Sequence, residues 1–161
     1  MGIRFQSAVF FVQDIDASRR FYEGLLEQKV LMDHGPNVGF EGGFALWQVD
    51  HALQIVFGET SMGNEPLGRK NLEIYFESDD LDAVWNRLVE EGLGVAHPMV
   101  EQPWGQRVFR VFDPDGHLVE VGEPMPAVIH RYAEQGMAAD VIAARTSMPL
   151  EIVQSILGQT L

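Results

Sequence analysis

The sequence predicts an α+β fold made of two βαβββ modules followed by a helical tail. Three observations support this prediction. The segments FFVQDIDASRRFYEGLL (10–26) and FESDDLDAVWNRLVEEG (76–92) share one pattern at a spacing of 66 residues. The same spacing relates two predicted hairpins further along the chain, and residues 125–161 lie outside the repeat. Because several independent features keep one spacing, the chain is predicted to contain a duplicated unit.

Each copy begins with an alternating strand that leads into an acidic D-[IL]-D-A sequence and then a helix. The matched pairs are Phe10 and Phe76, Asp14 and Asp80, Asp16 and Asp82, and Ala17 and Ala83. Acidic residues suit a helix N-terminus, where they cap free N–H groups and interact favourably with the helix dipole. Apolar stripes at helical spacing follow in both copies, at Ala17, Phe21 and Leu25 and at Leu81, Trp85 and Leu88.

A hairpin is predicted after each helix. In module one it comprises residues 44–49 and 52–57, and in module two residues 107–112 and 117–121. The second hairpin turns at Asp113-Pro114-Asp115-Gly116, a typical turn sequence. At the repeat spacing, Gln54 corresponds to Glu120, and both are expected on the face opposite their apolar neighbours.

The modules, about 1–60 and about 69–124, are predicted to form one domain (1–124), with a helical tail at 125–161. AVIHRYAEQG, AADVIAARTS and PLEIVQSILG indicate three short helices, separated by Gly136 and by Ser147-Met148-Pro149. The last two helices have the spacing of a helix-turn-helix. Their few basic residues would bind DNA poorly. The tail is therefore predicted to pack on its own domain or on a partner subunit.

Composition limits the classes of partner. The 161 residues carry 11 basic and 24 acidic side chains, a formal charge of −13. This charge repels phosphate backbones, so nucleic acid is not an expected partner. The chain has no cysteine, and no window approaches the ~18 to 20 apolar residues that span a bilayer. The N-terminal sequence does not resemble a signal peptide, so a cytoplasmic location without membrane association is expected.

The repeat places four polar residues at equivalent strand positions. Ser7 corresponds to Glu73 on the first strands, as Gln54 does to Glu120 on the last. If helices cover the opposite faces of these strands, the four side chains are predicted to meet around a cleft between the modules.

The segments VQDIDASRRFYEGLL, YFESDDLDAVWNRLVEEG and PWGQRVFRVFDPDGHLVEVGEP resemble the glyoxalase/bleomycin-resistance/dioxygenase group, the vicinal oxygen chelate superfamily. The resemblance covers about residues 4–124. It implies that the paired modules form a curved half-barrel sheet around a ligand cleft, often in a homodimer. It also implies that metal ligands in related enzymes match Ser7, Gln54, Glu73 and Glu120.

The metal-ligand pattern of that superfamily is only partly present. Glu120 keeps the usual residue, but no histidine occupies any of the four positions. Nickel, zinc and non-haem iron favour imidazole in such sites. Glu120 and Glu73 with the amide oxygen of Gln54 would better suit magnesium, manganese or calcium. No cofactor is expected beyond such a hard ion, and extradiol dioxygenation is not expected.

Glu120 and Glu73 have three interpretations from sequence: metal ligands, a coupled catalytic acid–base pair, or solvated and structural carboxylates. Ser7 and Gln54 are the remaining candidates around the predicted cleft. Further candidate ligand contacts are Trp104 on a glycine-flanked loop, Trp47 on its strand, Arg110, and His34 in the loop before the first hairpin. Arg110 could hold an anionic group of a ligand or pair with Glu73 or Glu120, and the pairing is favoured.

The sequence predicts a small-molecule-binding protein whose ligand lies in an apolar cleft with acidic groups, without an obligatory transition metal. The alternative is a metal-assisted lyase or isomerase of the glyoxalase type that uses Glu120, Glu73 and Gln54. A structural or regulatory dimer that uses the tail is a third class. The expected partners are a small organic ligand and a second copy of the chain.

Overall fold

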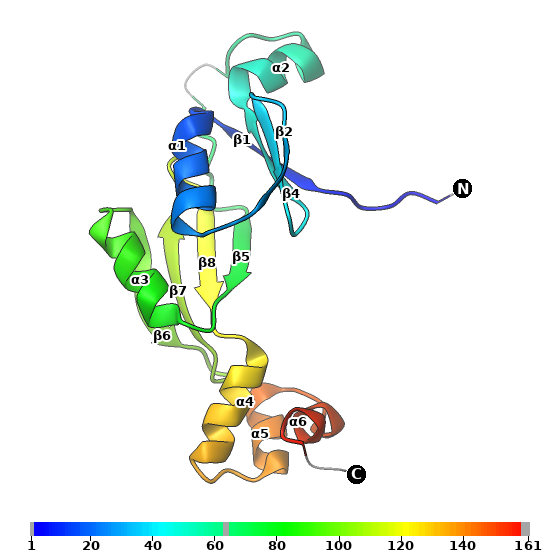
Figure 1. Ribbon diagram of the computed structural model, residues 1–161, viewed down its shortest axis with the longest axis vertical. Coiled ribbons are helices and arrows are strands. Elements are labelled where there is room, and N and C mark those ends of the chain that lie inside the picture. The colour runs from blue at the N-terminus through cyan, green and yellow to red at the C-terminus, as the bar shows by residue number, and fades with distance from the viewer. Residues whose placement is uncertain (1, 63–64, 159–161) are drawn as a thin grey trace. The chain divides into compact units, whose positions relative to one another are not determined.

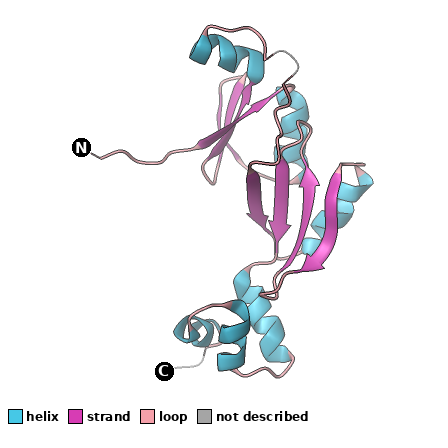
Figure 2. Ribbon diagram, turned by 180° about the vertical axis from the view of Figure 1, so that it is seen from behind, coloured by secondary structure: helices cyan, strands magenta, loops and turns pink. Residues whose placement is uncertain are grey.

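A computed structural model describes residues 2–62 and 65–158, and it confirms an α+β fold with two βαβββ modules and a helical tail (Figure 1). The chain divides into two compact units. Unit one holds the residues up to Leu72 together with Phe112–Leu118. Unit two holds Glu73–Val111 and the residues from Val119 onward. Figure 2 shows two separate open sheets, one for each module.

Module one is a mixed sheet with its helix between the first two strands. Its elements are β1 (Ala8–Val12), α1 (Ile15–Arg19), the π-helical η1 (Arg20–Leu25), β2 (Val30–Asp33), β3 (Asn37–Phe40) and β4 (Phe44–Gln48). The strand order is β1-β4-β3-β2, with β1 parallel to β4 and the other pairs antiparallel. The predicted helix start is confirmed, because the Asp14 carboxylate accepts the N–H groups of Asp16 and Ala17 at 3.0 Å.

One prediction for module one is wrong: residues 52–57 do not form a strand. They belong to α2 (Val49–Phe57), which follows β4 directly. Val49, Ala52 and Leu53 are buried at helical spacing, and Gly58 ends the helix with a φ of 71°. The last strand of module one is therefore β4, and Gln54 lies exposed on α2. His51, which falls between the two strands of that predicted hairpin, is also on this helix.

Module two repeats the topology, with longer second and third strands. Its elements are β5 (Glu73–Glu77), α3 (Leu81–Glu90), β6 (Val95–Glu101), β7 (Arg107–Phe112) and β8 (Leu118–Gly122), in the order β5-β8-β7-β6. Helix α3 covers one face, where the Trp85 ring packs edge-on against Phe109 at 5.1 Å. The opposite face carries Glu73 and Glu120, as the strand alternation predicted.

The tail consists of α4 (Met125–Glu134), α5 (Ala139–Thr146) and α6 (Leu150–Ile156). These helices enclose a small core of their own, made of Val128, Ile129, Tyr132, Ile142, Ala143 and Val153. The tail also contacts module two. Arg131 is 3.0 Å from a Glu123 carboxylate oxygen and donates to the Gly105 carbonyl at 2.6 Å. The helices thus form part of unit two.

The turn between β7 and β8 is held in unit one by a buried carboxylate. Asp113 Oδ2 accepts the Tyr22 hydroxyl at 2.8 Å and lies 2.9 Å from His117 Nδ1. Its Oδ1 accepts the N–H groups of Asp115 and His117 at 2.9 and 2.8 Å. Asp115 in turn accepts the Gln13 N–H at 3.0 Å. The carboxylate of Asp113 therefore joins the turn to η1 and fixes the turn's own conformation.

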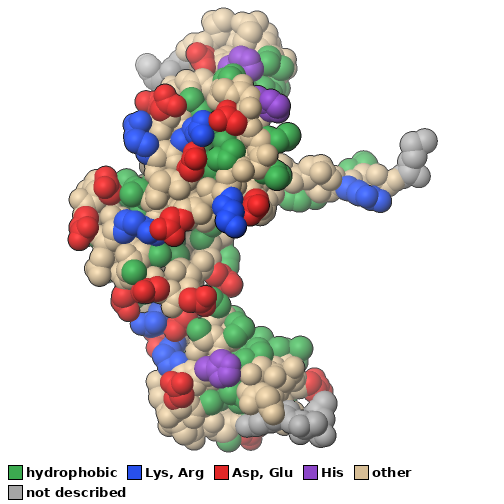
Figure 3. Space-filling model, viewed as in Figure 1, with side chains coloured by type: hydrophobic (Ala, Val, Ile, Leu, Met, Phe, Trp, Pro, Cys, Tyr) green, Lys and Arg blue, Asp and Glu red, His purple; other side chains and the backbone are tan. Residues whose placement is uncertain are grey.

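The surface drawn in Figure 3 carries interspersed acidic and basic side chains. Arg19, for example, lies 3.0 Å from Glu23 and 2.7 Å from Asp33. Across residues 2–62 and 65–158, no helix combines the length and apolar character needed to cross a bilayer.

We expect Tyr22→Phe to lower the free energy of unfolding by about 1.5–3 kcal/mol, because it leaves a buried carboxylate one donor short. Chemical unfolding at neutral pH measures this loss. Glu23→Gln is the matched control, since it breaks an exposed ion pair of the same helical segment and should cost less than about 1 kcal/mol. Equal losses in the two variants would contradict a stabilising role for the Tyr22–Asp113 hydrogen bond.

Candidate functional site

The candidate site is a row of polar side chains on the open face of the module-two sheet, which we call the polar row: Glu73, Glu120, Arg110 and His97. The turn at Asp113 sets its register. The Asp113 N–H donates to the His117 carbonyl and the Glu123 N–H donates to the Arg107 carbonyl, both at 3.0 Å. These bonds place Arg110 directly opposite Glu120, and His97 pairs with Arg110 on the other side.

Arg110 lies at the centre of the polar row. Its Nε is 2.5 Å from Glu73 Oε1, and a terminal nitrogen forms an ion pair with Glu120. The Glu120 side chain is only 9% exposed, whereas that of Glu73 is 38% exposed. One guanidinium thus holds two carboxylates from neighbouring strands, and the predicted pairing of Arg110 with Glu73 or Glu120 is confirmed for both partners.

His97 completes the contacts of Arg110. The Arg110 Nη1 lies 2.8 Å from His97 Nε2, and His97 Nδ1 lies 2.8 Å from the Pro98 carbonyl. Since a guanidinium can only donate, His97 Nε2 is the acceptor of the hydrogen bond with Arg110.

The environment of Glu120 favours its protonated form. Burial raises the pKa of the Glu120 carboxyl, and the hydrogen bond and negative charge of Glu73 raise it further, whereas Arg110 and His97 lower it. The net direction is upward. The carboxyl of Glu120 therefore binds a proton more tightly than an ordinary glutamate carboxyl does.

A second group of hydrogen bonds lies beside the polar row. The Trp104 indole donates to Gln106 Oε1 at 3.0 Å, Gln106 Nε2 donates to the Tyr75 hydroxyl at 2.8 Å, and Tyr75 donates to Glu77 at 2.9 Å. Burial, followed by the bond to Glu77, raises the pKa of Tyr75 to about 12, so the phenol stays protonated. Gly122 makes room for this group, because a Cβ there would lie 2.9 Å from the Tyr75 ring.

The other predicted site residues lie in unit one. Ser7 is exposed and donates to the Ala8 carbonyl at 2.9 Å. Trp47 donates to His51 Nδ1 at 2.8 Å, and His34 is exposed in the turn between β2 and β3. Gln54 is on α2, so its correspondence with Glu120 is wrong, and the face of β4 opposite α1 carries Ala45 and Trp47 in its place. The meeting of Ser7 with Glu73 and Glu120 stays a prediction.

Three side chains were not among the predicted site residues: His97, Tyr75 and Gln106. Tyr75 shares its strand face with Glu73, so the alternation of β5 was a sufficient signal. Gln106 directly precedes β7 and has the same strand alternation as Arg110, so it had a similar signal. His97 had none, because the register of β6 shifts on either side of it.

The acidic residues do not fit the divalent metal that the superfamily resemblance implied. Arg110 pairs with both Glu73 and Glu120, so a positive group already occupies the space between them. Gln54, the third proposed ligand, is on a helix of unit one. In the part of the chain that the structure describes, no three His, Asp or Glu side chains are grouped so as to hold a metal ion.

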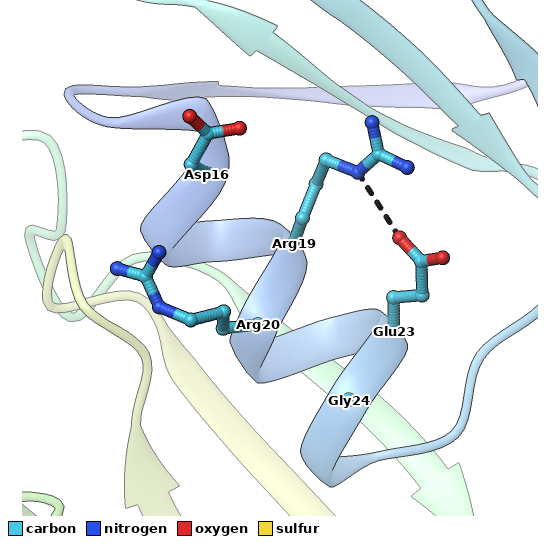
Figure 4. A pocket seen from close by; sticks show the side chains of 5 residues that line it. All are labelled: Asp16, Arg19, Arg20, Glu23 and Gly24. Atoms are coloured by element: carbon cyan, nitrogen blue, oxygen red, sulfur yellow. Dashed lines mark hydrogen bonds and ion pairs between the residues drawn. The ribbon is translucent and has the colours of Figure 1, made fainter.

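A hollow of about 470 Å³ on α1 and η1 was not predicted (Figure 4). Asp16, Arg19, Arg20 and Glu23 line it, and Figure 4 shows Arg20 directed away from the Arg19–Glu23 pair. Because Arg19 is held by two carboxylates of its own module, the hollow is a region of surface ion pairs, and the polar row remains the better candidate site.

Residues 5–126 match the glyoxalase-like domain family, so the chain belongs to this family. A solved structure of a protein of unknown function from Agrobacterium tumefaciens is 41% identical, with a TM-score of 0.71, over 76% of this chain and 95% of that one. A lactoylglutathione lyase from the same organism is 20% identical, with a TM-score of 0.58, over 78% and 96% of the two chains. At that identity only the fold is shared.

Curated relatives carry no functional description. An uncharacterised protein of Mycobacterium tuberculosis is 33% identical over 86 residues, which are 53% of this chain and 50% of the relative. A Mycobacterium bovis protein matches to the same extent over 56% of its length. The chain thus spans about half the length of the curated relatives it matches.

The raised pKa of Glu120 predicts a pH dependence. An acid with a higher pKa in the folded chain stabilises the fold below its unfolded pKa, and this contribution is lost as the pH rises through the folded value. The stability of the unsubstituted protein relative to Glu120→Gln should therefore fall as the pH rises from the ordinary glutamate pKa through the higher folded value, by about 1.4 kcal/mol per unit of pKa difference. Chemical unfolding at several pH values measures it. A difference that grows with pH would show instead that the ion pair with Arg110 dominates.

Proposed function

We propose that the chain is a metal-independent small-molecule-binding protein of the glyoxalase-like family, and that the polar row of module two contacts its ligand. The observation that supports this proposal is the position of Arg110. Its guanidinium takes the place between two carboxylates where a metalloenzyme of this fold would need a cation. Since Arg110 cannot lose its proton or exchange ligands as a metal ion does, the site is suited to holding a molecule and not to Lewis-acid chemistry.

The side chains on this face favour a polar ligand with an aromatic or apolar part. Glu73 is 38% exposed and offers a carboxylate oxygen to a hydroxyl or amine of the ligand. Trp104 is 40% exposed, and its indole is oriented by Gln106, so its ring face is available for stacking. Glu120 is buried, and its ion pair helps to hold Arg110 in position. We therefore infer that the ligand is a small aromatic or amphipathic molecule that carries hydrogen-bond donors.

Solved structures that share this fold have names that refer to different functions. The function of this chain is therefore better inferred from its site than from its fold. These structures include a glyoxalase/bleomycin resistance protein/dioxygenase from Nocardioides, at 22% identity and a TM-score of 0.58. Another is the fosfomycin resistance protein FosX from Mesorhizobium loti, at 21% identity and a TM-score of 0.54. One fold thus supports different chemistries, and the residues of the site decide between them.

Metal analysis tests the metal-independent proposal. We expect protein purified without chelator to contain far less than one equivalent of nickel, zinc, iron or manganese. Added magnesium, manganese or calcium should leave its melting temperature unchanged, because the guanidinium of Arg110 already pairs with both carboxylates. One equivalent of metal that survives dialysis and disappears in Glu73→Gln would contradict the proposal and favour the metal-assisted lyase or isomerase.

A thermal-shift screen of small aromatic and amphipathic molecules tests the binding surface. We expect the compounds that stabilise the parent to bind Trp104→Ala at least about tenfold more weakly, a loss of about 1.4 kcal/mol. Glu73→Gln should weaken the binding of compounds that carry an amine, because it removes the carboxylate charge. Glu23→Gln, on η1 in the other unit, is the control and should bind them normally. Compounds that bind all these variants as well as the parent would contradict the assignment of the polar row.

A further inference from the structure

Unit one contains a pocket of about 370 Å³ beside β1, an outer strand of its sheet. The pocket is formed by β1, by Met62 and residues 66–72, and by His117. Apolar side chains make up most of its lining, including Val9, Phe11 and Leu72. The polar side chains are Arg69, Asn71 and His117. No residue of the polar row contributes to the pocket.

His117 is the buried polar group of this pocket. The residue is 7% exposed, and the Phe10 ring packs against its imidazole at 5.9 Å between centroids. Its Nδ1 is 2.9 Å from Asp113 Oδ2, which also accepts the Tyr22 hydroxyl. Because Nδ1 is engaged by Asp113, Nε2 is the ring nitrogen that remains for a molecule in the pocket.

The charges around His117 favour a proton on both of its nitrogens. Burial lowers the pKa of the His117 ring, but the hydrogen bond and charge of Asp113, together with Asp115, raise it, and the net direction is upward. Tyr22 on η1 contributes no charge, because burial and Asp113 raise the pKa of its hydroxyl well above the usual value. Arg69, in the segment before β5, is the other charged group of the pocket.

Arg69 supplies a second positive charge at the rim. Its side chain is 48% exposed, and it pairs with Glu65 at 2.6 Å and donates to the Pro66 carbonyl at 3.0 Å. These two contacts orient the guanidinium without burying it. The pocket thus combines an apolar wall, a buried imidazole and an exposed guanidinium, and both of its titratable groups are bases.

We propose that this pocket binds small monocarboxylic acids with an apolar body. The carboxylate accepts hydrogen bonds from His117 Nε2 and Arg69, and the apolar body packs against Val9, Phe11 and Leu72. Hydrogen bonds between an imidazolium or guanidinium and a carboxylate are the strong, charge-assisted kind. The volume falls within the range of small-molecule pockets. The site shares no residue with the polar row, since every residue that forms it belongs to unit one.

The Asp113–His117 pair gives the proposed site its preference for an acid. Asp113 fixes the ring orientation and stabilises the imidazolium that a bound carboxylate needs. Binding should therefore be strongest at pH values below the pKa of His117 and weaken as the pH rises through it. A neutral ligand of the same shape would gain nothing from the protonated ring.

Phenylacetate is the probe ligand, and phenylacetamide, its uncharged amide analogue, is the control ligand. NMR of the histidine side-chain nitrogens, recorded during titration of the full chain, reports on His117 directly. We expect phenylacetate to shift the His117 signals and raise its pKa, and phenylacetamide to bind at least about tenfold more weakly. His117→Asn should weaken the binding of phenylacetate by at least about tenfold. His51 lies on α2 outside the pocket, so His51→Asn should leave this affinity unchanged.

Arg69→Gln keeps the test decisive if His117→Asn fails to fold, since Arg69 is exposed and lies at the rim. This substitution should weaken the binding of phenylacetate severalfold, and it should leave the pKa of His117 in the ligand-free protein nearly unchanged. The proposal is overturned if acid and amide bind equally, if binding is the same at pH 6 and pH 9, or if the shifts arise outside the pocket. It is also overturned if phenylacetate, benzoate and hexanoate all fail to bind up to about 10 mM.

Discussion

The buried carboxylate of Asp113 is the constraint on which both sites of this protein depend. It accepts four hydrogen bonds, from Tyr22, the His117 ring and two backbone N–H groups, so its turn has one conformation. That conformation sets the β7–β8 register and brings Arg110 opposite Glu120. The same carboxylate engages Nδ1 of His117 and leaves Nε2 for the pocket of unit one. A change at Asp113 would therefore affect stability, the polar row and the pocket together, and it could not be interpreted as a change in one of them.

Arg110 separates this chain from a metal-dependent use of the same fold. Two carboxylates on adjacent strands repel each other, and burial of Glu120 makes its negative charge costly unless a cation lies beside it. A divalent ion is one solution to this problem and a guanidinium is another. The planar fork of Arg110 reaches Glu73 through Nε and Glu120 through a terminal nitrogen, and it donates to His97 as well. A lysine at position 110 would not replace this arrangement, because all the donors of an ammonium group are on one nitrogen and do not form a planar fork.

The sequence predicted the modules, the helix starts and the strand faces of Glu73, Arg110 and Glu120, because each follows from local rules. Asp14 and Asp80 cap helices where expected, and strand alternation fixes which face a residue occupies. The helix at residues 52–57 and the position of His97 depend instead on tertiary structure. Residues 52–57 have apolar side chains at both helical and strand spacing, and the buried contacts of Ala52 and Leu53 select the helix. Counting back from the β6–β7 turn would place His97 opposite Val111, on the face covered by α3, but shifts in register on both sides of His97 bring it opposite Arg110.

The excess of acidic residues explains why the two proposed sites prefer ligands of opposite character. Several arginines are used to join carboxylates within the chain: Arg110 joins Glu73 and Glu120, Arg131 joins Glu101 and Glu123, and Arg19 joins Glu23 and Asp33. In the polar row two carboxylates share one guanidinium, so the remaining hydrogen-bonding capacity is that of an acceptor and suits a ligand with donors. In the pocket of unit one, Glu65 is the partner of Arg69 outside the lining, and Asp113 is turned toward the far nitrogen of His117. There the groups facing the ligand are donors, and an acid is the complementary molecule.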